Sequence, residues 1–389
     1  MNFARSRIED MNCVKSKIRE KAVRQKRHWI RLTRICNQRC VFCHDKENQT
    51  GGVLSFGEVL EELNRGRRRG CVRVIFSGGE PTLHPQLPQI IKRAKSLGYV
   101  HVQVVSNGRM FFYDDFLMKL KKAGLDEVTL SLHSHLEGPF EAISHVKGSY
   151  RQAMKGLFNA LRNRFIVSID IVINKINYKT IDDTLKFFMA LGVSEFDLLH
   201  LIPFGAAWRN REDVYYPMRE GKKYLDKAFA LSRKEHIHIW TNRLPAAYLE
   251  GYEELIQHPK KLEDEVRGME HELKRFIQTG QKMGCAGERC QYCFMNAFCR
   301  DIIELRTHRI LRAHAEPLCL NRKNTTSPPQ YRYRRNMSIY KFLDFFINYR
   351  YFVKSFRCED CELSSECFGA QINEIRSRGF RILTPLTAG

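Results

Sequence analysis

The stretch from Trp29 to His44 reads WIRLTRICNQRCVFCH, an apolar strand followed directly by three closely spaced cysteines. Cys36, Cys40 and Cys43 form a C-x3-C-x2-C pattern. Thiolates are the preferred ligands of iron–sulfur clusters, which normally take four cysteines. Three thiolates leave one iron without a protein ligand, and an open metal position is typical of catalytic sites. The pattern therefore predicts a catalytic iron–sulfur cluster on the loop after the first strand.

Three other interpretations of the triad are less favoured. Residues 40–44 match the C-x-x-C-H pattern of haem attachment, but the first thirty residues are rich in Lys and Arg and show no secretory signal. A zinc site with His44 as fourth ligand would be cramped, because adjacent residues rarely both point at one metal. Thirteen cysteines without an export signal favour metal ligands over disulfides. We therefore expect a cytoplasmic protein.

Short β-branched runs alternate with amphipathic segments through the first half of the chain. The alternation predicts strands near 29–35, 72–76, 100–105, 127–132, 165–173 and 195–201, and helices near 55–66, 85–97, 114–123, 149–162 and 180–191. Six repeats predict an α/β fold whose parallel sheet curls into a partial (β/α)6 TIM-like barrel. In such folds, functional side chains gather at the carboxyl ends of the strands.

Polar motifs follow successive predicted strands. The second strand leads into residues 77–81, Ser-Gly-Gly-Glu-Pro, where paired glycines let backbone approach a ligand and Glu80 offers a carboxylate to an ammonium. The later strands end at Ser106-Asn107-Gly108, at Ser131-Leu132-His133-Ser134, at Asn174, and at His200 with Pro203. A single Gly-Gly-Glu is more often a turn than a ligand site. The joint placement of these motifs nevertheless indicates one site at the barrel mouth.

The cysteine spacing, the aromatic residue before the third cysteine and the Gly-Gly-Glu segment resemble the radical S-adenosylmethionine (SAM) superfamily. The resemblance implies that a 4Fe–4S cluster on Cys36, Cys40 and Cys43 binds SAM and cleaves it reductively to a 5′-deoxyadenosyl radical, a chemistry grouped with the oxidoreductases. It also implies an electron donor such as flavodoxin or ferredoxin. The cofactor-binding residues implied are Phe42 near the adenine, Gly78, Gly79 and Glu80 at the methionyl end, Ser106, Asn107 and Ser131 near ribose and carboxylate, and Asn174.

Several histidines follow the predicted strands and are candidates for proton transfer near the substrate, because unperturbed histidine titrates in the useful range. They are His84, His133, His135 and His200. Most single histidines are ordinary surface or core residues. No catalytic acid or base is therefore assigned.

The chain divides into four predicted segments. They are a basic N-terminal segment (1–27), the radical SAM core (28–203), a charged helical bridge with prolines at 245 and 259 (204–283), and a cysteine-rich domain (284–389). A chain of 389 residues is long enough to bury an ample core.

The cysteine-rich domain contains two copies of C-x2-C-x5-C. Its cysteines are Cys285, Cys290, Cys293, Cys299, Cys319, Cys358, Cys361 and Cys367. Zinc is the main competitor as the bound metal, because C-x2-C pairs are its usual spacing. The domain resembles the SPASM and twitch extensions of radical SAM enzymes, which implies one or two auxiliary 4Fe–4S clusters.

The eight cysteines can be divided into two sets of four ligands, one for each cluster. The first set is Cys285, Cys290, Cys293 and Cys299, and the second is Cys319, Cys358, Cys361 and Cys367. Exchange of ligands between the two sets is equally consistent with the sequence. The order departs from the SPASM pattern, because both copies lack a further cysteine three residues later.

The net charge of +22 is concentrated in residues 5–34, 65–69 and 322–357. The last stretch interleaves basic and aromatic residues, which would suit RNA, an acidic peptide leader or an anionic membrane surface. A simpler interpretation is a core helix, because Phe342, Phe345, Phe346 and Tyr349 recur at helical spacing. No apolar run approaches the length of a transmembrane segment.

Three functions remain. The first is a maturase-like radical SAM enzyme that modifies a peptide or protein substrate, a class that SPASM-like domains often accompany. The second is a radical SAM enzyme that modifies RNA, for which binding should depend strongly on salt. The third is a non-catalytic iron–sulfur or zinc-stapled binding module, which the complete cysteine triad and the Gly-Gly-Glu segment disfavour.

Overall fold

The computed structural model of the protein describes residues 26–320 and 327–387. The chain forms two compact units, Met1–Asn242 (unit 1) and Arg243–Gly389 (unit 2). The N-terminal basic segment up to residue 25, with Cys13, lies outside the described residues, as do residues 321–326 of the third basic stretch.

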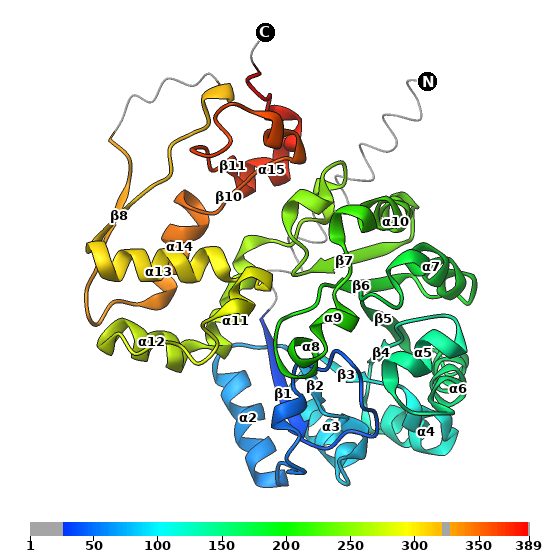
Figure 1. The fold of residues 1–389 in the computed structure, drawn as a ribbon. Helices are drawn as coiled ribbons and strands as arrows, with labels where there is room; N and C mark the ends of the chain where they lie inside the picture. Colours follow the sequence, from blue (N-terminus) through cyan, green and yellow to red (C-terminus); the bar gives the residue numbers. More distant parts are fainter. Residues whose placement is uncertain (1–25, 321–326, 388–389) are drawn as a thin grey trace. The chain divides into compact units, whose positions relative to one another are not determined.

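Unit 1 is built on a sheet of seven strands in the order β1 to β7, and every neighbouring pair is parallel (Figure 1). The strands are β1 (Arg27–Thr33), β2 (Arg73–Gly78), β3 (His101–Ser106), β4 (Glu127–Ser131), β5 (Ile166–Val172), β6 (Glu195–Leu199) and β7 (His238–Asn242). β1 and β7 do not pair, so the barrel is partial. The predicted α/β fold class is confirmed, with one strand more than the sequence indicated.

Helices connect the strands of unit 1. They are α2 (Phe56–Arg68), α3 (Leu87–Ser96), α4 (Asp114–Ala123), α5 (Glu137–Ser144), α6 (Ser149–Arg162), α7 (Ile181–Ala190), α8 (Gly205–Arg209), α9 (Arg211–Val214) and α10 (Met218–Ala230). A capping box starts α2, in which Ser55 Oγ accepts from Glu58 N and Glu58 Oε2 accepts from Ser55 N. The five predicted helices are present, and α5 and the helices α8 to α10 were not predicted individually.

The two faces of the strands differ in chemistry, because side chains alternate along each strand. One face carries fully buried aliphatic and aromatic side chains such as Val104, Leu130 and Phe196. The other face is polar, with Glu127, Thr129 and Ser168 among its residues. The polar face is therefore the lumen of the partial barrel.

Glu127 gathers the polar groups at the N-terminal end of the lumen. Its carboxylate accepts hydrogen bonds from His101 Nε2 at 2.7 Å, Gln103 Nε2 at 3.0 Å and Ser168 Oγ at 3.1 Å, and from Arg73 at 3.4 Å. A buried carboxylate is tolerated when it is paired and hydrogen-bonded in this way. These contacts join β2 to β5 across the floor of the lumen.

Unit 2 is mainly helical. Its elements include α11 (Leu262–Gly268), α12 (Glu270–Thr279), α13 (Asn296–His308), β8 (Ile310–Arg312), β9 (Gln330–Arg332), α14 (Ile339–Tyr349), β10 (Phe352–Val353), β11 (Ala370–Gln371) and α15 (Ile372–Arg378). Because unit 2 begins at Arg243, the predicted bridge 204–283 is shared between the two units, and its first part contributes β7 to the sheet.

The aromatic residues of α14 pack in the core of unit 2. Phe342 and Phe346 are buried and contact Phe298 of α13, with ring centroids 5.7 and 5.3 Å apart. Phe345 is also buried, whereas Tyr349 is partly exposed. The core interpretation therefore holds for Phe342, Phe345 and Phe346, whose rings are not available for stacking on RNA bases.

No helix in the described part of the chain has the length and apolar character needed to cross a membrane.

Candidate functional site

The three cysteines predicted to hold the catalytic cluster lie on one loop after β1. Burial raises the pKa of Cys36 to about 11, and it also raises the pKa of Cys40 and of Cys43. The charges of Cys36 and Cys43 act on Cys40 as well, so the three thiols are within electrostatic reach of one another. All twelve cysteines in the described residues are free thiols. This donor set fits a 4Fe–4S cluster, which prefers thiolate ligands, and metal binding would release the thiol protons.

Backbone hydrogen bonds hold the cysteine loop on two sides. Arg39 N donates to Ser144 O at 2.9 Å and Val41 N donates to Ile143 O at 3.0 Å, so the loop pairs with the end of α5. At its other end, Cys43 O accepts from the N–H of Ala206 in α8 at 2.9 Å, and Val41 O accepts from Asn210 Nδ2 at 2.8 Å. The loop is therefore shaped before any metal is considered.

The paired glycines lie against the start of the same loop. Gly79 N donates to Thr33 O at 2.8 Å, and a Cβ on Gly79 would lie 2.2 Å from Ile35 O. Gly78 has φ +134°, and a Cβ there would lie 2.5 Å from Thr33 O. Both positions therefore require glycine because protein backbone approaches closely. The sequence interpretation attributed this closeness to a ligand alone.

Glu80 lies between the ends of β2 and β3 and is only 1% exposed. Its carboxylate accepts from Thr82 N at 3.1 Å, Thr82 Oγ1 at 2.6 Å, Ser106 Oγ at 2.8 Å and Asn107 N at 2.8 Å. Burial raises the pKa of Glu80, and these four donors oppose the rise. The structure thus brings together three of the predicted cofactor-binding residues, Glu80, Ser106 and Asn107, in one hydrogen-bonded group.

Asn107 also connects this group to the cysteine loop. Its Nδ2 donates to Asn37 Oδ1 at 2.7 Å. Arg109 donates from Nη1 to Asn37 O and from Nε to Gln152 Oε1. Asn37 and Arg109 were not singled out from the sequence, although each stands inside or beside a motif that was.

The other predicted cofactor-binding residues follow neighbouring strands. Phe42 makes an edge contact with His133, with ring centroids 4.9 Å apart. Ser131 ends β4 beside Asp170 of β5. Asn174 is fully buried in a turn, where its side chain donates to Val172 O and accepts from Ile176 N.

Two of the four candidate histidines are occupied by structural contacts. His84 bonds Leu54 O through Nε2 at 2.8 Å and accepts from Gln86 N, and His135 bonds Thr184 Oγ1 at 2.9 Å. Burial lowers the pKa of His133 to about 3 and the pKa of His200 to about 4. Both are therefore neutral at physiological pH.

His133 has a defined tautomer. Its Nδ1 accepts the N–H of Val172 at 3.2 Å, so the ring proton is on Nε2. His133 also contacts Phe42. Within the part of the chain that the structure describes, none of the other three candidate histidines has a ring contact with a predicted cofactor-binding residue.

The cysteines of unit 2 fall into two groups. Burial raises the pKa of Cys299 to about 12, and the charges of Cys293, Cys285 and Cys290 add to the rise. Burial also raises the pKa of Cys358, with contributions from Cys319, Cys367 and Cys361. The grouping has the same membership as the two predicted ligand sets. Among the described residues, no three His, Cys, Asp or Glu side chains converge at the spacing of a single metal ion.

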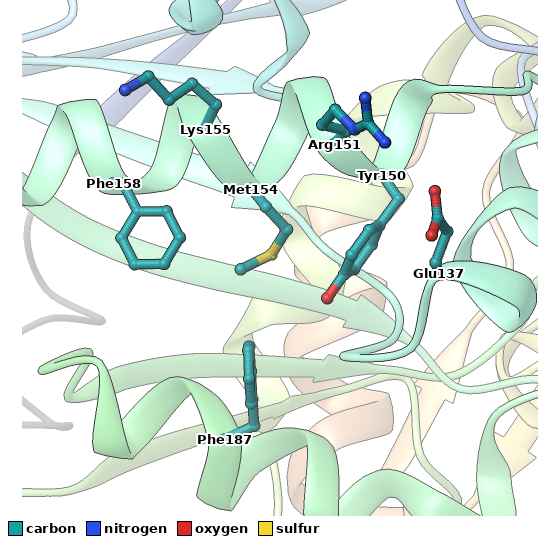
Figure 2. A pocket seen from close by; sticks show the side chains of 7 residues that line it. All are labelled: Glu137, Tyr150, Arg151, Met154, Lys155, Phe158 and Phe187. Atoms are coloured by element: carbon teal, nitrogen blue, oxygen red, sulfur yellow. The ribbon is translucent and has the colours of Figure 1, made fainter.

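A surface cavity of about 420 Å³ lies on the helical side of unit 1 (Figure 2). It is lined by Glu137, Tyr150, Arg151, Met154, Lys155, Phe158 and Phe187, from α5, α6 and α7. None of the predicted site residues lines it, so it is separate from the group at the strand ends.

A family model described as "Radical SAM superfamily" matches residues 30–188. A curated relative from Saccharolobus solfataricus, named "Probable GTP 3',8-cyclase", is 33% identical over 214 residues, which are 53% of this chain and 67% of that protein. A relative of the same name from Sulfurisphaera tokodaii is 33% identical over 229 residues, 57% of this chain and 72% of that protein. For relatives from Saccharolobus islandicus, the match spans 64% of their length.

A solved structure, Streptococcus suis SuiB bound to the precursor peptide SuiA, aligns with a TM-score of 0.49 and 15% identity over 91% of this chain and 73% of that chain. The family match covers β1 to α7, where the cysteine loop, the glycine pair and Glu80 lie. The chain belongs to the radical SAM superfamily.

Proposed function

We propose that this enzyme binds a 4Fe–4S cluster through Cys36, Cys40 and Cys43 and cleaves SAM reductively to start a radical reaction on a second substrate. The observation that carries the proposal is the docking of the cysteine loop on the Gly78-Gly79-Glu80 segment and on Asn107. When bound, the cluster supplies the electron that breaks the carbon–sulfur bond of SAM.

In this proposal, the residues of the chain bind the cluster and SAM and orient them. The three thiols hold the metal, and the glycine pair fixes the start of their loop. Glu80 and Asn107 stand at the adjacent strand ends, where they would contact the amino-acid part of SAM and its ribose. Phe42 contacts His133, and His133 offers an Nε2–H donor without a charge. The second substrate would then bind at the carboxyl ends of the strands, where these groups lie.

The first experiment compares reductant-dependent formation of 5′-deoxyadenosine by anaerobically purified wild type and by a variant with Cys36, Cys40 and Cys43 all changed to Ala. Product is expected from the wild type and not from the variant. Cys71→Ala is a matched control, since Cys71 is buried outside any cysteine group. Equal product from the triple variant would contradict the proposal.

We further propose that unit 2 holds two auxiliary 4Fe–4S clusters, one on each set of four cysteines. The grouping around Cys299 and around Cys358 supports this division. The triple variant should then retain about eight iron atoms per chain. Zinc in place of that iron would favour structural zinc sites instead.

For the second substrate we propose a peptide or protein. Two complete cysteine sets in a domain that resembles SPASM support this class, and the net charge of +22 would attract an acidic leader peptide. The test adds a candidate peptide, either free or fused to the enzyme. We expect a true substrate to increase the formation of 5′-deoxyadenosine and to gain a crosslink or a change in mass.

A second candidate is a purine nucleoside triphosphate, because relatives at 33% identity are named GTP 3',8-cyclases. This candidate predicts that GTP, but not ATP, stimulates SAM cleavage and is itself consumed. Consumption of GTP would replace the peptide proposal while leaving the SAM-cleaving site unchanged.

A further inference from the structure

Amide groups of two glutamines lie against the sulfur atoms of the cysteine loop. The backbone N–H of Gln38 donates to Cys36 Sγ at 3.4 Å, and the side-chain Nε2 of Gln49 donates to Cys43 Sγ at 3.5 Å. The third sulfur, Cys40 Sγ, lies 3.4 Å from Gln38 Oε1 and donates its thiol proton to it. Every sulfur of the triad therefore has an amide neighbour at hydrogen-bond distance.

Gln38 is a buried polar residue whose side-chain amide is only partly hydrogen-bonded. It is 4% exposed, and its Nε2 has no hydrogen-bond partner in the described residues. A buried amide donor without a partner costs about 1–3 kcal/mol, so such a group in a folded protein calls for an explanation. The site next to it is the predicted cluster.

The chemistry of Cys40 supplies the explanation. A cysteine sulfur that ligates iron has lost its proton and can only accept a hydrogen bond. Rotating the Gln38 amide by half a turn exchanges its oxygen and nitrogen, and then Nε2 faces Cys40 Sγ. The same side chain can thus accept from the free thiol and donate to the iron-bound sulfur.

Gln49 already has the donating orientation. Its Oε1 accepts from Lys46 Nζ at 3.3 Å, which leaves Nε2 directed at Cys43 Sγ. Lys46 follows the cysteine loop directly, at the start of a short 3-10 turn that ends before Gln49. The amide orientation is therefore set by a contact that does not involve the metal.

We propose that the side-chain amides of Gln38 and Gln49 donate N–H···S hydrogen bonds to Cys40 and Cys43 and raise the reduction potential of the cluster at this site. The inference rests on the cluster assignment in the proposed function. A reduced cluster carries one more negative charge, and hydrogen bonds to its sulfurs stabilise that charge. Neither glutamine needs to contact SAM or the second substrate, so both act through the cysteines.

The test measures the midpoint potential of the cluster whose electron paramagnetic resonance signal changes when SAM is added. That response separates this cluster from any in unit 2. The variants are Gln38→Met, Gln49→Met and the double variant, because methionine keeps the length of the chain and removes the amide. Gln86→Met is the matched control, since Gln86 is exposed and distant in sequence from the loop.

Each single variant is expected to have a more negative midpoint potential than the wild type, and the double variant the most negative. Unchanged potentials in both single variants would overturn the inference. A missing SAM-responsive signal in the wild type and in Gln86→Met would instead contradict the proposed function.

A second measurement covers the case in which Gln38→Met fails to assemble a cluster. Wild-type protein labelled with ¹⁵N only in glutamine side-chain amides is expected to show ¹⁵N coupling to the SAM-responsive signal. Gln49→Met should lose part of that coupling, and the remainder belongs to Gln38. Absence of any coupling in the wild type would overturn the inference for both residues.

Discussion

Asn107 Nδ2 donates a 2.7 Å hydrogen bond to Asn37 Oδ1, although the two residues are 70 positions apart in the chain. Asn37 lies between the first two cysteines of the loop, and Asn107 follows β3. The backbone N–H of Asn107 donates to Glu80 at the same time. One residue therefore connects the predicted metal ligands to the predicted SAM-binding carboxylate.

Replacing Asn107 by Ala should disturb both groups. Residues that orient metal ligands typically change metal affinity or activity about 10- to 100-fold when mutated. We expect 5′-deoxyadenosine formation to fall within that range, with partial loss of iron. Asn163→Ala is the control, because Asn163 Nδ2 bonds Asp114 and Asn159 away from the loop. Equal activity in the two variants would show that the Asn107 contact is dispensable.

A methyl group on Gly79 should displace the start of the cysteine loop, since the new Cβ would lie 2.2 Å from Ile35 O. Overpacking of this kind costs about 1–3 kcal/mol. We expect Gly79→Ala to lower the melting temperature and the iron content together. Gly138→Ala, where a Cβ meets nothing within 4 Å, should leave both unchanged or slightly raise stability. Normal iron content in Gly79→Ala would contradict the docking described above.

Glu80→Gln tests whether the carboxylate has a role beyond joining two strand ends. The amide keeps the shape of the side chain, but its NH2 group, which cannot accept, replaces either the oxygen that accepts from Thr82 and Ser106 or the oxygen that accepts from Asn107. We expect at least a tenfold weaker SAM affinity by calorimetry, with iron content near that of wild type. Loss of iron with unchanged SAM affinity per cluster would assign Glu80 to loop structure alone.

Acid should destabilise unit 1 through its buried histidines. Burial lowers the pKa of His200 to about 4, below the ordinary value of 6.5. Between these two pH values the histidine is protonated in the unfolded chain and neutral in the folded chain. The free energy of unfolding should therefore fall as pH drops below 6.5, by about 2 kcal/mol for one histidine at pH 5. In the His200→Phe variant, the free energy of unfolding measured with urea should depend less on pH between 5 and 6.5. Exposed His236→Gln should not; identical profiles for the two variants would contradict the assignment.

Unit 2 depends on a buried ion pair. Arg350 donates from Nε to Asp301 Oδ2 at 2.6 Å and from Nη2 to Asp301 Oδ1 at 2.9 Å, and both side chains are nearly buried. Removing one partner leaves the other charge uncompensated, which typically costs about 3–5 kcal/mol. Arg350→Met should unfold unit 2 at much lower denaturant. Arg378→Met, which breaks a pair on the exposed side of α15, should change stability by less than about 1 kcal/mol.

Most elements of the fold could be predicted from local sequence patterns. Five of the six strands that the sequence predicts are rich in β-branched residues, and glycines after α3, α4 and α7 end those helices as expected. β7 (His238–Asn242) was missed because the charged residues on both sides of it favoured a helical bridge over the whole of 204–283. α5 was missed because it has eight residues and contains Pro139.

The site was predictable in its residue types more than in its contacts. Cysteine spacing is a local signal, so the triad and the eight cysteines of unit 2 could be named from the sequence. The hydrogen bonds of Asn37 with Asn107 and the approach of Gly79 to Ile35 join distant segments, and no periodic pattern reports them. α5 matters for the same reason, because its carbonyl groups at Ile143 and Ser144 hold the loop.

The contact between Asn210 and Val41 spans 169 positions. During synthesis, the cysteine loop therefore emerges from the ribosome long before the residue that fixes its far side. Until Asn210 has been synthesised, the three thiols stand on a loop that lacks its contacts with α8 and Asn210. The full set of contacts that shapes the cysteine loop can therefore exist only after α8 and Asn210 have been synthesised and have packed against it.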